Sequence, residues 1–409
     1  MRKILMISYD FPPIANSGVF RIVKSAKFLY QFGWKPLILT VKNPDKYMAK
    51  IDANFLTDKL DYVKVFRAYS VPFGWITKAG RLGINYKWLV TPDPFIGWLP
   101  SAITLGKKIV LKEKVDIIYA TSPPATNLLI GLILKKITKK PLVVEYRDLW
   151  VGNPFSRYPT KLHLDIEKKL EETVLNNSNT IIALGSLERK RLMAIYPFLD
   201  EAKIFLIPNG YDPEDFVSTK PYKFEKLTIL HAGTIYARRF EYLKIFLEAL
   251  RQICKEDGVD LQLILLGKSP PNIKRKLSRI IRELGLDSIV QMLKIKPYKE
   301  SLRLIMGANI LLLIPGGPIN ITTKIFDYFA SKKFIFNIAD LRSETARLIS
   351  DAKAGVTVQP NRNAIYKVLH GILQTSNYDS HIDAQVLKQY SRLEETRKLA
   401  DILNQMIEN

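Results

Sequence analysis

Short runs of apolar residues alternate with stretches of helical periodicity along almost the whole chain. In the first half these runs are rich in Val, Ile and Leu and lack polar alternation, which is typical of parallel strands buried on both faces. The runs are Lys3–Ser8, Pro36–Val41, Val115–Ala120, Pro141–Tyr146 and Thr180–Gly185. Helix-period segments such as Gly18–Phe32 and Thr160–Asn176 lie between them. This alternation predicts an α/β fold with a doubly wound, Rossmann-like parallel sheet.

The second half of the chain repeats the pattern. Its strand-like runs are Leu227–Gly233, Leu261–Gly267, Ile289–Lys294, Ala308–Ile314, Lys333–Ile338 and Gly355–Gln359. The helical stretches that connect them are Arg239–Lys255, Pro271–Leu284, Tyr298–Met306, Lys324–Ala330 and Arg342–Ile349. We therefore expect a second doubly wound sheet.

A chain of 409 residues exceeds what one ordinary core supports, so two domains are expected. A strand-like segment ends in the turn Pro208-Asn209-Gly210, which marks the join. We expect an N-terminal domain over residues 1–207, a C-terminal domain over residues 208–383, and a helix over residues 384–409 that packs back across the cleft. Ligands of doubly wound sheets bind beyond the carboxyl ends of the strands, so two facing domains predict a cleft enzyme.

The composition is that of a folded protein, with 47% hydrophobic and 25% charged residues, and the net charge is +23. Nucleic acid, anionic lipid and phosphorylated substrates all gain from such an excess of cations, and a general basic bias without a partner is the alternative. No recognised nucleic-acid motif is present, so we expect no nucleic-acid partner.

The chain is expected to be cytoplasmic. Cys254 is the single cysteine, which suits a reducing compartment. The apolar run at the N-terminus breaks at Asp10 and Pro12, and it predicts a buried strand, not a signal peptide. The apolar helical stretch Ala125–Lys140 ends in Lys135, Lys136, Lys139 and Lys140. These lysines are expected to share one helical face at i and i+4, which predicts docking to the anionic inner face of the membrane. The alternative is that the cations simply suit the end of a buried helix.

Polar residues follow the expected strands of the N-terminal half. A helix begins near Ser17-Gly18, where an anion site or a plain N-cap is predicted. Arg147-Asp148 follows the fourth strand directly, at the edge where a ligand binds, although a structural ion pair is the alternative. Trp98 belongs to an aromatic, proline-rich stretch, Tyr86–Pro100, and is a candidate acceptor contact.

Basic, glycine-containing loops follow the expected strands of the C-terminal half. Gly233 and Thr234 permit close backbone approach, and Arg239 follows them. Lys268 ends the next strand. Arginine gives bidentate contacts to phosphate oxygens, so these loops predict a phosphate site.

The stretch Pro315–Lys333 is the most informative. A glycine-rich loop leads to a helix that begins near Thr322-Thr323, with Lys324 and Asp327 in its first turn and a half. Backbone N–H groups at a helix N-terminus and a lysine suit a diphosphate. Asp327 is then placed to accept hydrogen bonds from sugar hydroxyls, or it only favours the helix dipole.

The sequence lacks the residue patterns that metal-dependent, nucleophilic and dinucleotide-dependent catalysis would need. The four histidines are scattered, and no metal-ligand cluster or nucleophile elbow is present. A G-x-G-x-x-G fingerprint is also missing, which argues against a dinucleotide cofactor. We therefore expect group transfer without a metal or cofactor, with a nucleotide-diphosphate sugar as co-substrate.

Together these motifs resemble the family-4-like glycosyltransferases of bacterial surface-polysaccharide pathways. The resemblance rests on the Asp10–Arg21 loop, the Arg147–Trp150 box, Asn209–Asp212, Gly-Thr-x-Tyr-x-x-Arg over Gly233–Arg239, and Lys324–Ala330. It implies the GT-B fold, two facing doubly wound domains with a cleft between them. It also implies retaining, metal-independent transfer of the hexosyltransferase type, with the acceptor in the N-terminal domain and the nucleotide sugar in the C-terminal one.

The resemblance also implies roles for individual residues. Arg239 and Lys324 would neutralise the leaving diphosphate, with Asp148 as a third catalytic residue. Asp327 stands where the family has a glutamate that holds the nucleotide ribose, and Ile319 stands where it has a glutamate that binds the donor sugar. The expected donor-binding set is Gly18, Gly233, Thr234, Arg239, Lys268, Thr322, Thr323, Lys324 and Asp327. The expected acceptor-binding set is Ser17, Arg147, Asp148 and Trp98.

The sequence therefore predicts transfer of a sugar to a lipid-linked or polysaccharide acceptor. Two alternatives remain. A nucleotide-sugar epimerase of the same fold would convert the donor without an acceptor. A catalytically silent binding protein is the other, because of Ile319 and because Ala125 and Leu128 stand where family members often carry a histidine.

Overall fold

The chain folds into two compact units, Met1–Asn209 with Arg392–Asn409, and Gly210–Ser391. The structure is a computed structural model, and it describes residues 1–44, 51–52, 62–73, 85–154, 156–375, 378 and 380–408. The expected terminal helix over residues 384–409 is two helices instead, α14 (Ala384–Gln389) and α15 (Arg392–Glu408). Leu387 of α14 packs into the core of the second unit, whereas Leu403 of α15 packs into that of the first. Apolar packing therefore divides this segment between the two units.

The first unit is built on a parallel sheet of seven strands in the order β3-β2-β1-β4-β5-β6-β7. The strands are β1 (Arg2–Ile7), β2 (Trp34–Val41), β3 (Lys64–Ala68), β4 (Ile117–Ser122), β5 (Leu142–Tyr146), β6 (Thr180–Ala183) and β7 (Ile204–Leu206). Strand β3 was not expected from the sequence. As an edge strand with a single neighbour it is only partly buried, so it lacks the continuous apolar run of the central strands.

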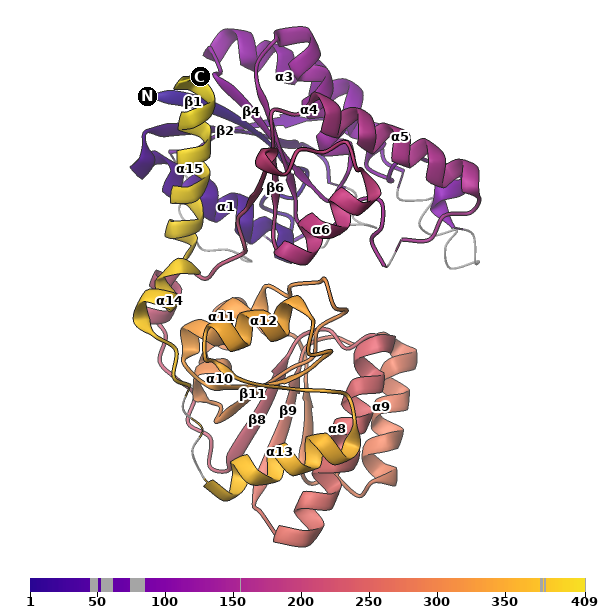
Figure 1. Cartoon of the computed structure of the whole chain (residues 1–409), viewed down its shortest axis with the longest axis vertical. Coiled ribbons are helices and arrows are strands. Elements are labelled where there is room, and N and C mark those ends of the chain that lie inside the picture. The colour runs from indigo at the N-terminus through magenta and orange to yellow at the C-terminus, as the bar shows by residue number, and fades with distance from the viewer. Residues whose placement is uncertain are drawn as a thin grey trace. The chain divides into compact units, whose positions relative to one another are not determined.

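Helices cover both faces of this sheet (Figure 1). They are α1 (Ser17–Leu29), α3 (Leu99–Glu113), α4 (Thr126–Thr138), α5 (Lys161–Asn177), α6 (Ser186–Ile195) and α15, with the short 3₁₀ turns η1 (Tyr30–Phe32), η3 (Tyr86–Trp88), η4 (Ile96–Trp98) and η5 (Glu201–Lys203). α15 also belongs here through polar contacts, because Asn404 accepts hydrogen bonds from Arg2 and from the Trp34 indole.

The second unit has a parallel sheet of six strands in the order β10-β9-β8-β11-β12-β13. Its strands are β8 (Leu227–Ala232), β9 (Leu261–Leu266), β10 (Val290–Leu293), β11 (Ile310–Leu313), β12 (Phe334–Ile338) and β13 (Gly355–Val358). Its helices are α7 (Pro213–Val217), α8 (Ala237–Asp257), α9 (Pro271–Glu283), α10 (Tyr298–Gly307), α11 (Lys324–Ser331), α12 (Glu344–Asp351), α13 (Arg362–Thr375) and α14. One core lies under α8, α9 and α13, and another lies under α10, α11 and α12. The predicted class, α/β with two doubly wound parallel sheets, is confirmed.

Each strand order reverses at one point, between β1 and β4 in the first sheet and between β8 and β11 in the second. Ligands of doubly wound sheets bind at the carboxyl ends of the strands beside such a switch point. The loops that follow β1, β4, β8 and β11 are therefore where each unit is expected to hold its ligand.

Candidate functional site

Arg239 is the central cation of the second unit's switch point. It lies in the first turn of α8, just after the loop that follows β8, and only 8% of the residue is exposed. Its Nη1 donates to the carbonyl oxygen of Thr234 at 2.9 Å, and its guanidinium lies 4.7 Å from the centre of the Tyr236 ring. Its Nε has no partner among the described residues, and burial lowers the pKa of Arg239. A buried guanidinium with an unused donor is suited to bind an anion.

Lys324 approaches the same place from the other side of the switch point. It is the first residue of α11, at the end of the loop that follows β11. Burial lowers the pKa of Lys324, the nearby Arg239 lowers it further, and Asp327 opposes both. Tyr298 donates to Oδ1 of Asp327 at 3.0 Å. The structure thus brings Arg239, Lys324 and Asp327 together, as the sequence predicted.

His231 and Tyr328 belong to this group although neither was in the expected site. Nδ1 of His231 lies 2.9 Å from the carbonyl oxygen of Leu312, so Nδ1 carries the hydrogen and Nε2 is an acceptor. Burial, Arg239 and Lys324 lower the pKa of His231 to about 3, which keeps the ring neutral. The Tyr328 hydroxyl accepts from the N–H of Ala232 at 2.9 Å. A histidine that ends an apolar strand is ambiguous in sequence, and only the fold shows which cations surround it.

The glycines of the donor-side loops allow close packing. Gly267 has φ +150°, and a Cβ there would lie 2.3 Å from the carbonyl oxygen of Gly233. A Cβ on Gly233 would lie 3.3 Å from Nη1 of Arg239. Gly267 therefore requires the smallest residue, because the backbone of the loop after β8 occupies the space, whereas a side chain at position 233 would make Arg239 shift by a few tenths of an ångström.

A hollow of about 310 Å³ opens beside these loops. Gly233, Gly267 and Lys268 line one side of it, and Met292, Leu293 and Ile295 line another. Its mixture of backbone, apolar side chains and a few cations is typical of a small-molecule pocket. Thr322 and Thr323 lie just before α11, and Thr323 makes no side-chain capping bond there.

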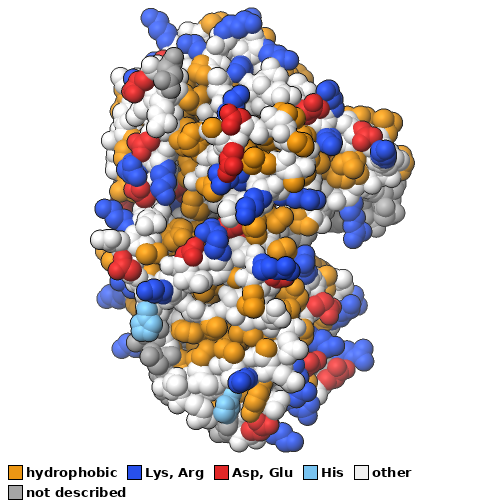
Figure 2. Space-filling view, in the orientation of Figure 1, with side chains coloured by type: hydrophobic (Ala, Val, Ile, Leu, Met, Phe, Trp, Pro, Cys, Tyr) orange, Lys and Arg blue, Asp and Glu red, His pale blue; other side chains and the backbone are white. Residues whose placement is uncertain are grey.

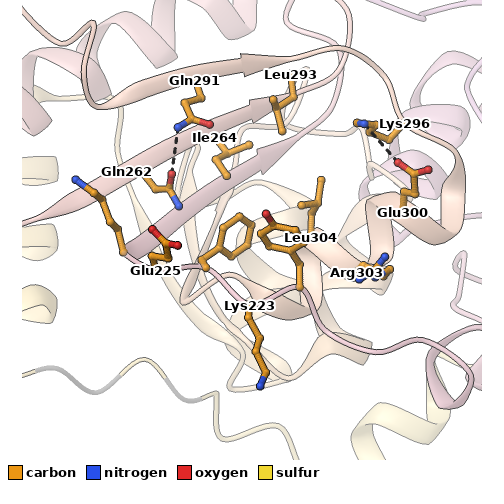
Figure 3. Close-up of a pocket in the computed structure, with 13 residues that line it drawn as sticks. Lys223, Glu225, Gln262, Ile264, Gln291, Leu293, Lys296, Glu300, Arg303 and Leu304 are labelled. Carbon is orange, nitrogen blue, oxygen red and sulfur yellow. Dashed lines mark hydrogen bonds and ion pairs between the residues drawn. The ribbon is translucent and has the colours of Figure 1, made fainter.

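A larger hollow, of about 600 Å³, lies elsewhere on the second unit, over the face of β9 and β10 (Figure 3). Gln291 donates to Gln262 at 3.4 Å across its floor, and Lys296 pairs with Glu300 at 3.5 Å on its rim. None of the expected donor residues lines it. Volume alone therefore does not identify the site.

In the first unit, Arg147 joins the ends of three strands. It pairs with Asp10 at 3.4 Å and donates to the carbonyl oxygen of Pro123. A Cβ on Gly18 would lie 2.0 Å from Nη1 of Arg147, which accounts for glycine in the first turn of α1. Ser17 is exposed beside it. Asn16, not Ser17, caps the helix by accepting from the N–H of Val19 at 3.3 Å.

Asp148 lines a hollow of about 420 Å³ at the ends of β4 and β5. The loop Ser122–Ala125 forms part of its wall, together with Phe95, Trp150 and Asn153. Ala125, where the resembled family often has a histidine, therefore lies at this hollow. Lys87 and Glu167 close it below as a buried ion pair with a 2.7 Å contact. Sequence reasoning missed Lys87 and Glu167, because a lone lysine and a helix glutamate carry no signal.

Two expectations need correction. Trp98 was expected to contact an acceptor, but it is wholly buried in the core of the first unit, edge-on to Tyr9 at 5.6 Å. The lysines that end α4 were expected to share a helical face. The helix ends at Thr138, Lys139 takes a left-handed conformation with φ 60°, and Lys135 donates to Asn179 at 2.5 Å. The four lysines therefore do not form one helical face.

Glu188 is a buried acid whose pKa is affected by the nearby charge of Asp148. The N–H of Leu184 donates to it at 2.7 Å, yet burial and the carboxylate of Asp148 raise its pKa from 4.5 to about 8. Because the folded state holds this proton more tightly than the unfolded state, the contribution of Glu188 to the free energy of unfolding is largest below pH 4.5 and falls as the pH rises to about 8. Glu188→Gln removes this fall. Above pH 8 we therefore expect the free energy of unfolding of the variant to exceed that of the wild type by a few kcal/mol, roughly.

Urea unfolding followed by tryptophan fluorescence measures this effect, because all five tryptophans lie within residues 1–207. Glu172→Gln, at a half-exposed position paired with Lys169, is the control and should leave the pH profile unchanged. Parallel profiles for Glu188→Gln and the wild type would contradict the assignment.

Two features are absent from the described residues. No group of three or more His, Cys, Asp or Glu residues in this part of the chain is placed to hold a metal ion. No helix among the same residues is both long and apolar enough to span a membrane.

Comparison with known proteins agrees with this geometry. Residues 64–215 match the sequence model of Glycosyltransferase Family 4. The fold resembles a glycosyltransferase from Rickettsia africae (TM-score 0.70, 17% identity, 100% of this chain and 99% of that one). It also resembles Anabaena HepE, crystallised with UDP and glucose (TM-score 0.70, 15% identity, 99% and 100%).

A putative UDP-N-acetylglucosamine 2-epimerase from Listeria monocytogenes is similar to a smaller degree (TM-score 0.60, 12% identity, 99% and 96%). A search of curated proteins by sequence finds no match. Residues 64–215 thus match the model of Glycosyltransferase Family 4, in a chain that has the two-sheet GT-B fold.

Proposed function

We propose that this chain is a retaining, metal-independent glycosyltransferase that moves a sugar from a nucleotide-diphosphate sugar to a lipid-linked or polysaccharide acceptor. One observation carries the proposal. Arg239, which is buried, and Lys324, which is half-buried, are two cations beside one switch point, and Nε of Arg239 has no partner among the described residues. Two like charges so placed cost free energy unless an anion joins them.

The chemistry requires such cations. In sugar transfer the bond between the anomeric carbon and the phosphate oxygen breaks, and its electron pair stays on the nucleoside diphosphate. The acceptor hydroxyl forms the new bond, and its proton passes to the departing phosphate. Cations fixed where the negative charge develops lower the barrier more than a strong base would. Retention of configuration is part of the proposal because the family resemblance implies it.

The remaining donor residues fit around these cations. The hollow of about 310 Å³ is placed to take the nucleobase, with Gly233 and Gly267 allowing the backbone to approach it. Asp327, held by Tyr298, is placed for a ribose or sugar hydroxyl. HepE was crystallised with UDP, so a UDP-sugar is the first donor to test.

In the first unit, Asp148 and the hollow that it lines are proposed to hold the acceptor. The hollow combines proline and aromatic walls with polar groups from Asp148, Asn153 and Ser156. Flat apolar surfaces with a few polar groups suit a sugar ring, which has apolar faces and a hydroxyl rim.

Release of nucleoside diphosphate tests this function. We expect release from a panel of nucleotide sugars only when both a donor and a polyprenyl-phosphate-linked or oligosaccharide acceptor are present. If the donor were converted to an isomer without any acceptor, the protein would be assigned as an epimerase and not as a transferase. No thermal shift with any nucleotide or nucleotide sugar would favour a silent binding protein, since a bound donor stabilises the folded state by mass action.

A further inference from the structure

Four large apolar side chains are exposed together on the first unit, and we name them the α5 patch. They are Trp88 (56% exposed), Leu89 (55%), Leu162 (65%) and Ile166 (43%). Trp88 and Leu89 lie at and just after the 3₁₀ turn η3, and Leu162 and Ile166 lie in the first half of α5.

The four side chains are neighbours in space. The ring of Trp88 meets the ring of His163 edge-on, with centroids 5.1 Å apart. Leu162 and Ile166 are four residues apart on one helix, so they lie on one side of it and flank His163. Leu89 directly follows Trp88 in the chain. The patch is therefore continuous from the turn to the helix.

Cations surround this apolar surface. Arg157, Lys161 and Lys168 are exposed on or beside α5, and the carbonyl oxygen of Arg157 accepts from Asn85 next to the turn. Figure 2 shows hydrophobic side chains with Lys and Arg side chains among them over the outer part of α5. Asp165 is also exposed on α5, but the cations outnumber it. A tryptophan and aliphatic side chains with several Lys and Arg beside them match the interface of an anionic bilayer, because the apolar groups insert and the cations meet headgroup phosphates.

The patch shares a wall with the hollow that Asp148 lines. Lys87, the residue before Trp88, points inward to Glu167 at 2.7 Å, and Glu167 follows Ile166. Lys87 also lies 4.0 Å from the centre of the Tyr158 ring, and both Lys87 and Glu167 line the hollow of about 420 Å³. One layer of side chains therefore separates an apolar outer surface from the polar hollow beneath it.

We propose that the α5 patch inserts into the interfacial layer of an anionic lipid bilayer and thereby brings the Asp148 hollow to lipid-borne molecules. The occupant is the bilayer itself. The consequence for the acceptor, that it is a sugar carried on a membrane lipid, rests on the proposed function. Insertion of the patch does not rest on it, and the two can fail separately.

Vesicle binding by the whole chain tests the proposal. Sucrose-loaded phosphatidylcholine vesicles with and without phosphatidylglycerol are sedimented with the protein, and we expect binding to the anionic vesicles. Leu162→Glu with Ile166→Glu should reduce the partition coefficient at least about tenfold, since each change removes apolar contact and adds charge repulsion. Val217→Glu, at a 90% exposed position in the second unit, is the matched control and should bind like the wild type.

Trp88 supplies a second readout. Its emission should shift to the blue with anionic vesicles, and Trp88→Phe should still bind but show a smaller shift, because Trp34, Trp98 and Trp150 are buried. Unchanged sedimentation of the Leu162→Glu, Ile166→Glu variant would overturn the proposal. If only the Lys136→Glu, Lys139→Glu variant lost binding, the membrane contact would lie at the end of α4 instead. A dimer that this patch variant dissociates, without vesicle binding, would make the patch a protein interface. Arg239→Ala should bind vesicles normally, so a failure of the transferase assignment remains distinguishable.

Discussion

Arg239→Ala is expected to lower kcat/KM for the nucleotide-sugar donor by about two to three orders of magnitude, the usual effect of removing one fixed transition-state donor. Arg239 is 8% exposed and sits in the first turn of α8 over the Tyr236 ring. Lys324, the other cation of the pair, belongs to α11. Loss of the guanidinium therefore leaves the developing charge on the leaving diphosphate half compensated.

Two companion variants separate charge from packing. Arg239→Lys keeps a cation but loses the fork of donors, so its kcat/KM should fall between those of the wild type and the alanine variant. Arg251→Ala changes an exposed arginine of the same helix, about 18 Å further along its axis, and should have wild-type kinetics. Steady-state release of nucleoside diphosphate measures all three, and wild-type turnover in Arg239→Ala would remove Arg239 from the site.

Arg21→Met is expected to destabilise the first unit by about 3–5 kcal/mol, the typical cost of stranding a buried charge. Arg21, in α1, is 3% exposed and pairs with Glu145 at 2.7 Å and with Glu395 of α15 at 2.9 Å. It also donates to the carbonyl oxygens of Ile207 and Pro208, each at 3.0 Å. One side chain therefore holds together α1, β5, the segment that follows β7, and α15.

The pH dependence gives this prediction a sign. Burial alone would raise the pKa of Glu145, but Arg21 outweighs it and lowers the pKa below 4.5. The pair therefore contributes stability above pH 4.5, and that contribution is lost as the pH falls through the lower folded pKa. The difference between wild type and Arg21→Met should be largest near neutral pH and should shrink in acid.

Urea unfolding followed by tryptophan fluorescence, at neutral pH and in acid, measures the stability of this unit. Arg189→Ala, which breaks a partly exposed pair with Glu201, is the control and should change the free energy of unfolding by less than about 1 kcal/mol. If Arg21→Met behaved like this control, the buried cluster would not hold α15 to the first unit.

The candidate site was predicted in part from sequence, and the difference has a physical cause. Arg239, Lys324 and Asp327 follow directly from strands that could be recognised, so their convergence follows from parallel topology. Trp98 and the lysines at the end of α4 follow no strand end. Their burial and backbone conformation depend on what packs against them, which the sequence does not encode locally. His231, Lys87 and Glu167 were missed for the same reason.

By itself, the sequence determined the fold class, the order of the strands other than the edge strand β3, and the join near Asn209, because continuous apolar runs and turn residues are local signals of buried strands and their ends. The tertiary structure decided what those signals cannot carry. It divided the C-terminal segment between two cores and paired Lys87 with Glu167 across 80 positions of sequence. It also left Trp88 exposed while Trp98 was buried. Each of these depends on contacts between residues far apart in the chain, and such contacts exist only once the sheets have formed.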